Sequence, residues 1–190
     1  MGTAGLLLAA GGGRRMGRAK ALVPVPGGSG TLLERGLRVL RDAGCAPVVV
    51  VLGASADLAR PLAGAADLVV EAADWADGQS ASLRVGLTAL QDTDADAACV
   101  LLVDLPDVGA DAVARVRGAA GEDPGALARA AYEGTPGHPV VMGRAHWAGA
   151  LATLHGDEGA RGYLATHPHL VVECGDLATG QDVDTPADLG

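Results

Sequence analysis

The stretch LAAGGGRRMGRAKALVPV, residues 8–25, is the first part of the sequence whose residue types could do chemistry. It holds four glycines, four basic residues and no acidic residue, in a chain with a formal net charge of −9. Its basic residues are Arg14, Arg15, Arg18 and Lys20. Glycine lets backbone amides approach a ligand closely, and phosphate accepts hydrogen bonds from amides and guanidinium groups alike. We therefore expect a phosphate-binding loop here; the alternative is a solvated surface loop.

Two familiar phosphate-binding patterns do not fit this stretch. A dinucleotide fingerprint needs G-x-G-x-x-G, but counting from Gly11 and Gly13 places Met16 at the third glycine. A Walker loop needs lysine directly after its last glycine, whereas Arg18 follows Gly17. The spacing therefore disfavours a nicotinamide-dependent oxidoreductase and a Walker-type phosphate loop.

An aspartate follows an apolar run in VLLVDLPDV, residues 100–108. Asp104 stands at the carboxyl end of the strand that we expect over residues 98–103. An unpaired carboxylate after so apolar a run is costly, and a bound metal ion would offset that cost. The alternative role, a turn or helix N-cap aspartate before a helix, suits Asp107 better than Asp104.

The elements that must position these residues alternate along the chain. Short aliphatic runs bounded by Gly, Pro or Asp predict buried strands, and segments with helical spacing lie between them. Thr31 and Glu34 are spaced for a capping box, and Gly44 ends that helix. The expected strands are 5–10, 47–52, 67–71, 98–103, 126–132, 138–142 and 169–174. The expected helices are 31–43, 80–91, 110–120, 145–154 and 158–166.

This alternation predicts an α/β fold with three layers, α/β/α, around a mostly parallel sheet. Ligands then bind beyond the carboxyl ends of the strands. The adjacent strands expected near residues 132 and 138 predict a small antiparallel element. At 190 residues the chain suits one domain, covering 1–190.

The glycine-rich run also fits the pattern L-A-A-G-x-G-x-R-M-G-x-x-K, and in this it resembles the MobA-like NTP transferase (nucleotidyltransferase) family with its GT-A, Rossmann-like fold. Residues 74–87 resemble the W-x-x-G-x-x-x-S-L-x-x-G-L element of molybdenum cofactor cytidylyltransferases. Residues 137–147 and 156–164 resemble the same subgroup, and QDVDTPADL, residues 181–189, resembles a C-terminal D-x-D-T-P-x-D-L pattern. The matches therefore reach from residue 8 to residue 189.

The resemblance implies a role for each matching residue. Arg15, Lys20 and Asp104 are the catalytic candidates, and Asp104 with Asp184 would hold Mg²⁺ through oxygen, leaving coordination positions for phosphate and water. Thr185 to Asp188 also fit a plain helix start. The resemblance implies that His138 and Arg161 bind the acceptor. It implies that the nucleotide is bound by Leu8, Ala9, Ala10, Gly11, Gly13, Arg15, Lys20, Gly78, Ser80 and Ser82.

Some of these assignments have a structural alternative. Ser80 and Ser82 would open a helix N-terminus that favours anions, or would simply cap that helix. His138 would contact an acceptor phosphate, or it would have a structural role only. Asp157 and Glu158 would position Arg161 by pairing with it.

The reaction that the resemblance implies is attack by an acceptor phosphate on the α-phosphorus of a nucleoside triphosphate. Ala10 stands where guanylyl-transferring relatives have glycine, and its methyl group would crowd a purine, which favours CTP by about 1 to 3 kcal/mol. The expected acceptor is molybdopterin, although Leu105 replaces a glutamine common in that subgroup. A guanylyl- or sugar-phosphate nucleotidyltransferase, or a non-catalytic nucleotide- or cofactor-binding protein, stays open.

Composition limits the partners. The net charge of −9 argues against general binding to nucleic acid or to an anionic membrane surface. Three distant cysteines fit neither a disulfide framework nor a zinc site, so we expect buried thiols and a reducing, cytoplasmic location. We expect no membrane segment and no secretory signal. A recipient molybdoenzyme or a chaperone is a possible partner.

Overall fold

A computed structural model describes residues 2–121 and 123–189 of the chain. Its centre is a seven-stranded sheet in the order β3-β2-β1-β4-β6-β5-β7. All strands run in one direction except β6, which is antiparallel to both of its neighbours, β4 and β5. The strands are β1 (Gly2–Ala9), β2 (Val48–Leu52), β3 (Leu68–Glu71), β4 (Ala95–Leu102), β5 (Leu127–Tyr132), β6 (Thr135–Gly143) and β7 (Leu170–Glu173). The predicted mostly parallel sheet with a small antiparallel element is confirmed.

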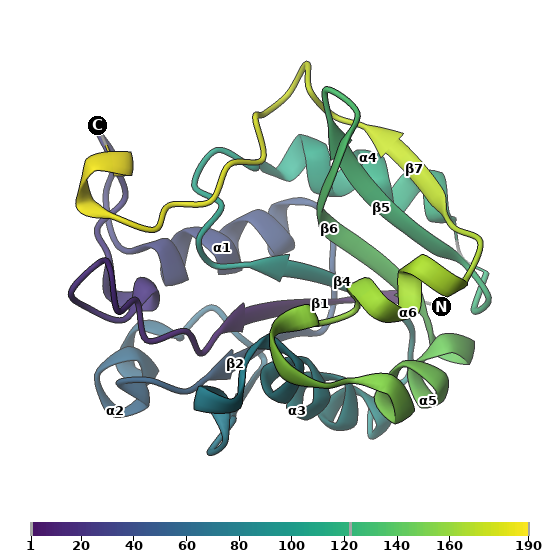
Figure 1. The fold of residues 1–190 in the computed structure, drawn as a ribbon, viewed down its shortest axis with the longest axis horizontal. Helices are drawn as coiled ribbons and strands as arrows, with labels where there is room; N and C mark the ends of the chain where they lie inside the picture. The colour runs from purple at the N-terminus through teal and green to yellow at the C-terminus, as the bar shows by residue number, and fades with distance from the viewer. Residues whose placement is uncertain (1, 122, 190) are drawn as a thin grey trace.

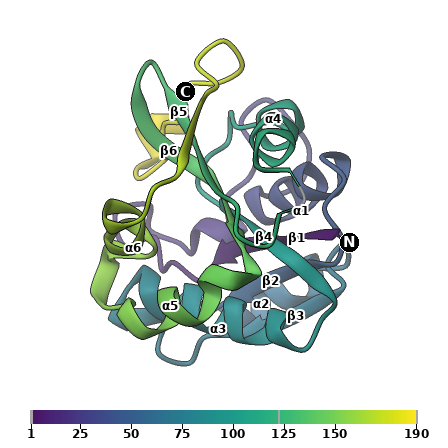
Figure 2. The same ribbon diagram turned by 90° about the vertical axis from the view of Figure 1, so that its right-hand side faces the viewer.

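Helices cover both faces of this sheet, which gives the three expected layers (Figure 1). α1 and α4 pack on one face, and α3, α5 and α6 pack on the other (Figure 2). The helices are α1 (Leu32–Asp42), α2 (Ala56–Ala59), α3 (Gln79–Gln91), α4 (Ala110–Ala120), α5 (Arg144–Thr153) and α6 (Arg161–Thr166). None of the described helices is long and apolar enough to cross a membrane.

The core is aliphatic and is divided by the sheet into two clusters. Successive side chains of a strand point to opposite faces, so Leu7 of β1 packs on the α1 side and Leu6 on the α3 side. α3 comes unusually close to the sheet at Gly86, where an added Cβ would lie 2.6 Å from a methyl carbon of Leu6. Cys45, Cys99 and Cys174 are free and buried, as expected.

Most predicted elements are present, with differences at their ends. The capping box is confirmed, because the Thr31 side chain accepts from the Glu34 amide while Glu34 accepts from the Thr31 amide. β4 begins at Ala95, earlier than predicted, and α2 was not predicted. The helix predicted over 158–166 is wrong at its start: a 3-10 turn ends at Glu158, Gly159 has φ +54°, and α6 begins only at Arg161. This positive φ breaks helical geometry.

Candidate active site

The glycine-rich loop leaves the carboxyl end of β1 and folds back on itself. Gly13 has φ +56°, and a Cβ there would collide with the carbonyl oxygen of Arg18, so only glycine fits. The Gly17 amide donates to the Gly13 carbonyl oxygen at 2.9 Å. The loop therefore leads into a short 3-10 turn, η1 (Lys20–Leu22), which presents Lys20 at the edge of the sheet.

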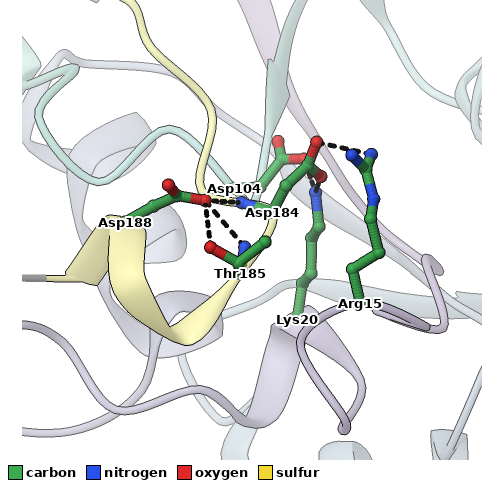
Figure 3. Close-up of polar contacts among 6 residues, drawn as sticks. All are labelled: Arg15, Lys20, Asp104, Asp184, Thr185 and Asp188. Carbon is green, nitrogen blue, oxygen red and sulfur yellow. Dashed lines mark hydrogen bonds and ion pairs between the residues drawn. The ribbon is translucent and has the colours of Figure 1, made fainter.

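Lys20 lies between two carboxylates that are distant in the sequence (Figure 3). Its Nζ donates to Asp104 Oδ2 at 2.6 Å and to Asp184 Oδ1 at 2.7 Å. Arg15 Nη2 donates to the other oxygen of Asp184, Oδ2, at 2.6 Å. The side chains of Lys20 and Asp104 are only 14% and 17% exposed, whereas that of Arg15 is 73% exposed. The predicted convergence of the loop with two remote acidic residues is therefore present.

The C-terminal segment carries Asp184 to this centre through backbone contacts. The Val183 amide donates to the Asp104 carbonyl oxygen at 2.9 Å. Asp188 Oδ2 accepts from the amides of Asp184 and Thr185 and from the Thr185 hydroxyl (Figure 3). These bonds belong to the 3-10 helix η5 (Pro186–Leu189), so the helix start considered for Thr185 to Asp188 is present, as a short 3-10 helix.

Asp107 also holds this C-terminal segment. Its Oδ2 accepts from both the amide and the hydroxyl of Thr179, at 2.6 Å each. Of the two roles considered for Asp107, the helix N-cap is wrong, since the N-cap of α4 is Gly109, whereas the turn is present at Asp107. Thr179 and Val183 thus both hydrogen-bond to the segment that follows β4, and these bonds hold the stretch that carries Asp184 in place.

The pKa values of Lys20 and Asp184 are both shifted by the ion cluster. Burial lowers the pKa of Lys20, but the charges of Asp104 and Asp184 and their hydrogen bonds outweigh burial, so this pKa lies above its ordinary 10.5. The hydrogen bond from Lys20, followed by the charges of Lys20 and Arg15, holds the pKa of Asp184 below its ordinary 3.8. Lys20 and Asp184 therefore each favour the ionised form of the other.

The chemistry of this donor set fits a hard divalent cation. Asp104 Oδ1 is buried and has no hydrogen-bond partner among residues 2–121 and 123–189. A buried carboxylate oxygen without a partner is costly, and a cation would satisfy it. The described residues contain no cluster of three or more His, Cys, Asp or Glu that could hold a metal ion. A cation at Asp104 and Asp184 would thus take its other ligands from phosphate and water.

A cleft of about 650 Å³ opens from this centre along the sheet edge. Much of the predicted site lines it: Leu8, Ala10, Gly11, Lys20, Gly78, Ser82, Asp104, His138 and Arg161. Five predicted residues are not part of its lining. Arg15 and Asp184 flank the cleft at the ion pair, Gly13 shapes the loop, and Ala9 packs in the core on the α1 side.

Ser80 is the fifth residue outside the lining. Its buried hydroxyl donates to the His155 carbonyl oxygen at 2.8 Å and accepts from the Gly159 amide at 3.1 Å. The alternative that Ser80 or Ser82 caps α3 is wrong, because Gly78 is the N-cap and no side chain caps this helix. Ser80 ties the start of α3 to the turn before α6, while Ser82 faces the cleft.

The far end of the cleft holds His138 and Arg161. Burial, followed by the charges of Arg129 and Arg161, lowers the pKa of His138 to about 4. The expected pairing of Arg161 with Asp157 or Glu158 is not formed; Glu158 instead lies 3.8 Å from His155. His138 is therefore a neutral side chain beside two guanidinium groups at physiological pH.

Among the cleft residues that sequence reasoning missed are Trp75, Gln79 and Arg129. Trp75 packs on the glycine loop, where a Cβ on Gly12 would lie 3.0 Å from its indole ring. The W-x-x-G pattern contained Trp75, so the signal for it was present. Nothing in the sequence around Arg129 distinguished it from an ordinary strand residue.

A glycine loop at the first strand, a lysine between two remote aspartates and a cleft at the carboxyl edge of a parallel sheet together define a nucleotidyltransferase-type α/β protein. The sequence model of the MobA-like NTP transferase domain matches residues 5–171. The chain belongs to this family.

Three comparisons describe its relatives. The chain is 36% identical over 192 residues to the nicotine blue oxidoreductase of Paenarthrobacter nicotinovorans, covering 95% of this chain and 91% of the relative. It is 37% identical over 127 residues to a probable molybdenum cofactor guanylyltransferase of Opitutus terrae, covering 66% of this chain and 59% of that protein. The structure of Rv0371C from Mycobacterium tuberculosis H37Rv in complex with manganese superposes with a TM-score of 0.69 at 30% identity, covering 92% of this chain and 88% of the other.

Proposed function

We propose that the protein transfers a nucleoside monophosphate from CTP to the terminal phosphate of a molybdopterin acceptor and releases pyrophosphate, with Mg²⁺ as its cofactor. The observation that carries this proposal is the contact of Lys20 with both Asp104 and Asp184 beside the glycine loop. A nucleotidyltransferase needs cationic groups for the triphosphate and oxygen ligands for a cation in one place. No residue of the centre has to act as a nucleophile, because the acceptor phosphate attacks.

The chain's own groups would bind and align the substrates. The amides near Gly11 and Gly13 and the side chains of Arg15 and Lys20 would hold the triphosphate and stabilise the negative charge that develops at the α-phosphate. Asp104 and Asp184 would hold Mg²⁺, which when bound screens charge on the phosphate oxygens. Lys20 would then exchange its carboxylate partners for phosphate oxygens. Alignment and charge stabilisation supply the rate enhancement.

The nucleobase would lie between the glycine loop and the start of α3. Trp75 offers an aromatic face there, and Ala10 is only 3% exposed at the cleft wall. The methyl group of Ala10 limits the depth available to a base, which favours the smaller pyrimidine. Its effect is worth only about 1 to 3 kcal/mol, so CTP would be preferred over GTP without excluding it.

The relative named as an oxidoreductase supports a second candidate, reduction or oxidation of a small organic substrate with a nicotinamide cofactor. The loop argues against the usual dinucleotide binding mode. Met16, at the third glycine position, is 6% exposed in the core, and the loop leads into the short 3-10 helix η1 rather than directly into an α-helix. In the described part of the chain, no α-helix N-terminus therefore follows the loop at the place where a pyrophosphate would bind.

One assay separates these candidates. The protein is incubated with Mg²⁺, molybdopterin and in turn CTP, GTP or ATP, and pyrophosphate release is measured; parallel reactions follow NADH and NADPH oxidation. The proposal predicts the fastest pyrophosphate release with CTP. Reactions with a sugar phosphate in place of molybdopterin test the alternative acceptor. Nicotinamide oxidation without pyrophosphate release would favour the second candidate, and labelled CTP binding without turnover would favour a binding protein.

A further inference from the structure

A second basic group lies in the cleft, away from Lys20. Arg129 on β5, His138 on β6 and Arg161 at the start of α6 line the same end. The Arg129 guanidinium makes one long hydrogen bond, 3.5 Å to the Gly137 carbonyl oxygen, and its Nε is buried without a partner among the described residues. Within residues 2–121 and 123–189, neither arginine forms an ion pair with an acidic side chain.

This arrangement is unfavourable unless an anion binds to it. Burial lowers the pKa of Arg129, and the positive charge of Arg161, which lines the same cleft, lowers it further. His138 adds no negative charge that would balance them. A half-buried cation without a counterion costs free energy, and a bound phosphate or carboxylate would offset that cost with charge-assisted hydrogen bonds.

The sheet aims Arg129 into the cleft. Ala128 and Ala130 belong to the core on the α1 side, so Arg129 between them faces the other side, where α3 and α6 lie. The pairing register of β5 and β6 shifts between Arg129 and Ala131. Such irregularities bend a strand and redirect side chains, and they are frequent beside binding sites.

The register also separates this basic group from the Lys20 centre. Arg129 pairs with Val140 of β6, which pairs with Val100 of β4. Arg129 thus lies two strands across the sheet and four residues back from Asp104. With about 4.8 Å between strands and about 3.3 Å per residue, the two Cα atoms are about 16 Å apart. The Arg129 side chain reaches from there to the Gly137 carbonyl oxygen, so it covers part of this distance.

We infer that Arg129 and Arg161 form a second anion subsite, which holds an anionic group of the acceptor other than the phosphate that reacts beside Lys20. The acceptor is thus a molecule with two separated anionic groups rather than a compact monophosphate. The assignment of this anion to the acceptor rests on the proposed function. The anion subsite itself, at Arg129 and Arg161, does not depend on the proposed function.

The test uses alkane bisphosphonates of increasing chain length, with methylphosphonate as the single-anion reference, and isothermal titration of the intact protein. A bisphosphonate that spans both subsites should bind at least about tenfold more tightly than methylphosphonate, because its second group binds intramolecularly. Bisphosphonates too short to span both subsites should bind no more tightly than methylphosphonate. Arg129→Gln and Arg161→Gln should abolish the tighter binding, whereas the matched control Arg38→Gln, an exposed arginine on the opposite face of the sheet, should keep it.

Arg161 is exposed, so its variant tests the subsite even if the Arg129 variant does not fold. Binding that is unchanged in both arginine variants would overturn the inference. Binding that depends on both arginines but not on chain length would support the subsite and count against phosphate binding at Lys20, and so against the proposed function. These outcomes therefore distinguish a failure of the anion subsite from a failure of the proposed function.

Discussion

Lys20 Nζ lies 2.6 Å from Asp104 Oδ2, although 84 positions separate the two residues in the sequence. The contact joins the glycine loop after β1 to the end of β4, because these two parallel strands are neighbours in the sheet. Lys20 is also the only lysine of the chain. The ammonium group lies between the two carboxylates that we propose as ligands of a divalent cation.

Removing Lys20 should convert this ion cluster into a stronger cation site. In Lys20→Ala the carboxylates of Asp104 and Asp184 face each other without an ammonium ion, which should cost on the order of 1 to 3 kcal/mol of folding free energy. The variant should still fold, with a lowered Tm. Added Mg²⁺ should then raise its Tm more than it raises that of the parent, which thermal melts at increasing Mg²⁺ concentration would measure.

The control for this prediction is the double variant Lys20→Ala, Asp104→Asn, which removes one carboxylate. It should lose the enhanced response to Mg²⁺. An equal Mg²⁺ response in the parent, the single variant and the double variant would mean that Asp104 does not bind the cation.

Much of this centre could be predicted from the sequence, because its signals are local. The glycine spacing, the single loop lysine and the aspartate after an apolar strand each stand in a short window. The sheet was predictable for the same reason, since continuous aliphatic runs such as Val48–Leu52 indicate buried parallel strands. α2, only four residues long, offered too short a pattern.

The remainder depends on contacts between distant segments. Ser80 resembles a helix cap in sequence, but its hydroxyl bonds to the turn near Gly159, which only the packing of α3 against that turn reveals. Arg129 resembles any outward residue of a strand. The anion subsite proposed for it rests on the β5 and β6 register shift and on Arg161, neither of which a local pattern encodes.

Trp75 should report nucleotide binding by fluorescence. The chain has two tryptophans, and Trp147 is 2% exposed in the core, whereas Trp75 lines the cleft beside the glycine loop. A nucleobase stacked on Trp75 should quench its emission with a saturating dependence on CTP concentration. Trp75→Phe should remove the quenching. Quenching of equal size in Trp75→Phe would place the nucleotide elsewhere.

His138 should make folding stability depend on pH. Its pKa in the folded protein, about 4, lies below its ordinary 6.5, so between these values the unfolded chain binds more protons than the folded one. Stability from this group is complete above pH 6.5 and falls as the pH drops toward 4, by on the order of 1 to 3 kcal/mol. Urea unfolding between pH 6.5 and 4 should show a smaller loss of unfolding free energy in His138→Gln than in the parent. The same dependence of unfolding free energy on pH in both proteins would contradict a lowered pKa for His138.

Asp188 should act by positioning Asp184 rather than by touching substrate. Asp188→Ala removes the acceptor for the amides of Asp184 and Thr185. The misplaced Asp184 carboxylate should lower kcat by about 10- to 100-fold, with little change in Tm because the residue is exposed. Asp176→Ala is the matched control, since Asp176 is an exposed C-terminal aspartate that pairs with Arg115. Equal kcat values in the two variants would exclude a positioning role.

The central claim, that the Lys20 and Asp104 centre transfers a nucleotidyl group, is tested most directly by pyrophosphate release from CTP with molybdopterin and Mg²⁺. Asp104→Asn should keep the fold and lose about 10² to 10³ in rate, while Asp111→Asn, an exposed aspartate on α4, should match the parent. Pyrophosphate release at the parental rate in Asp104→Asn would contradict the account.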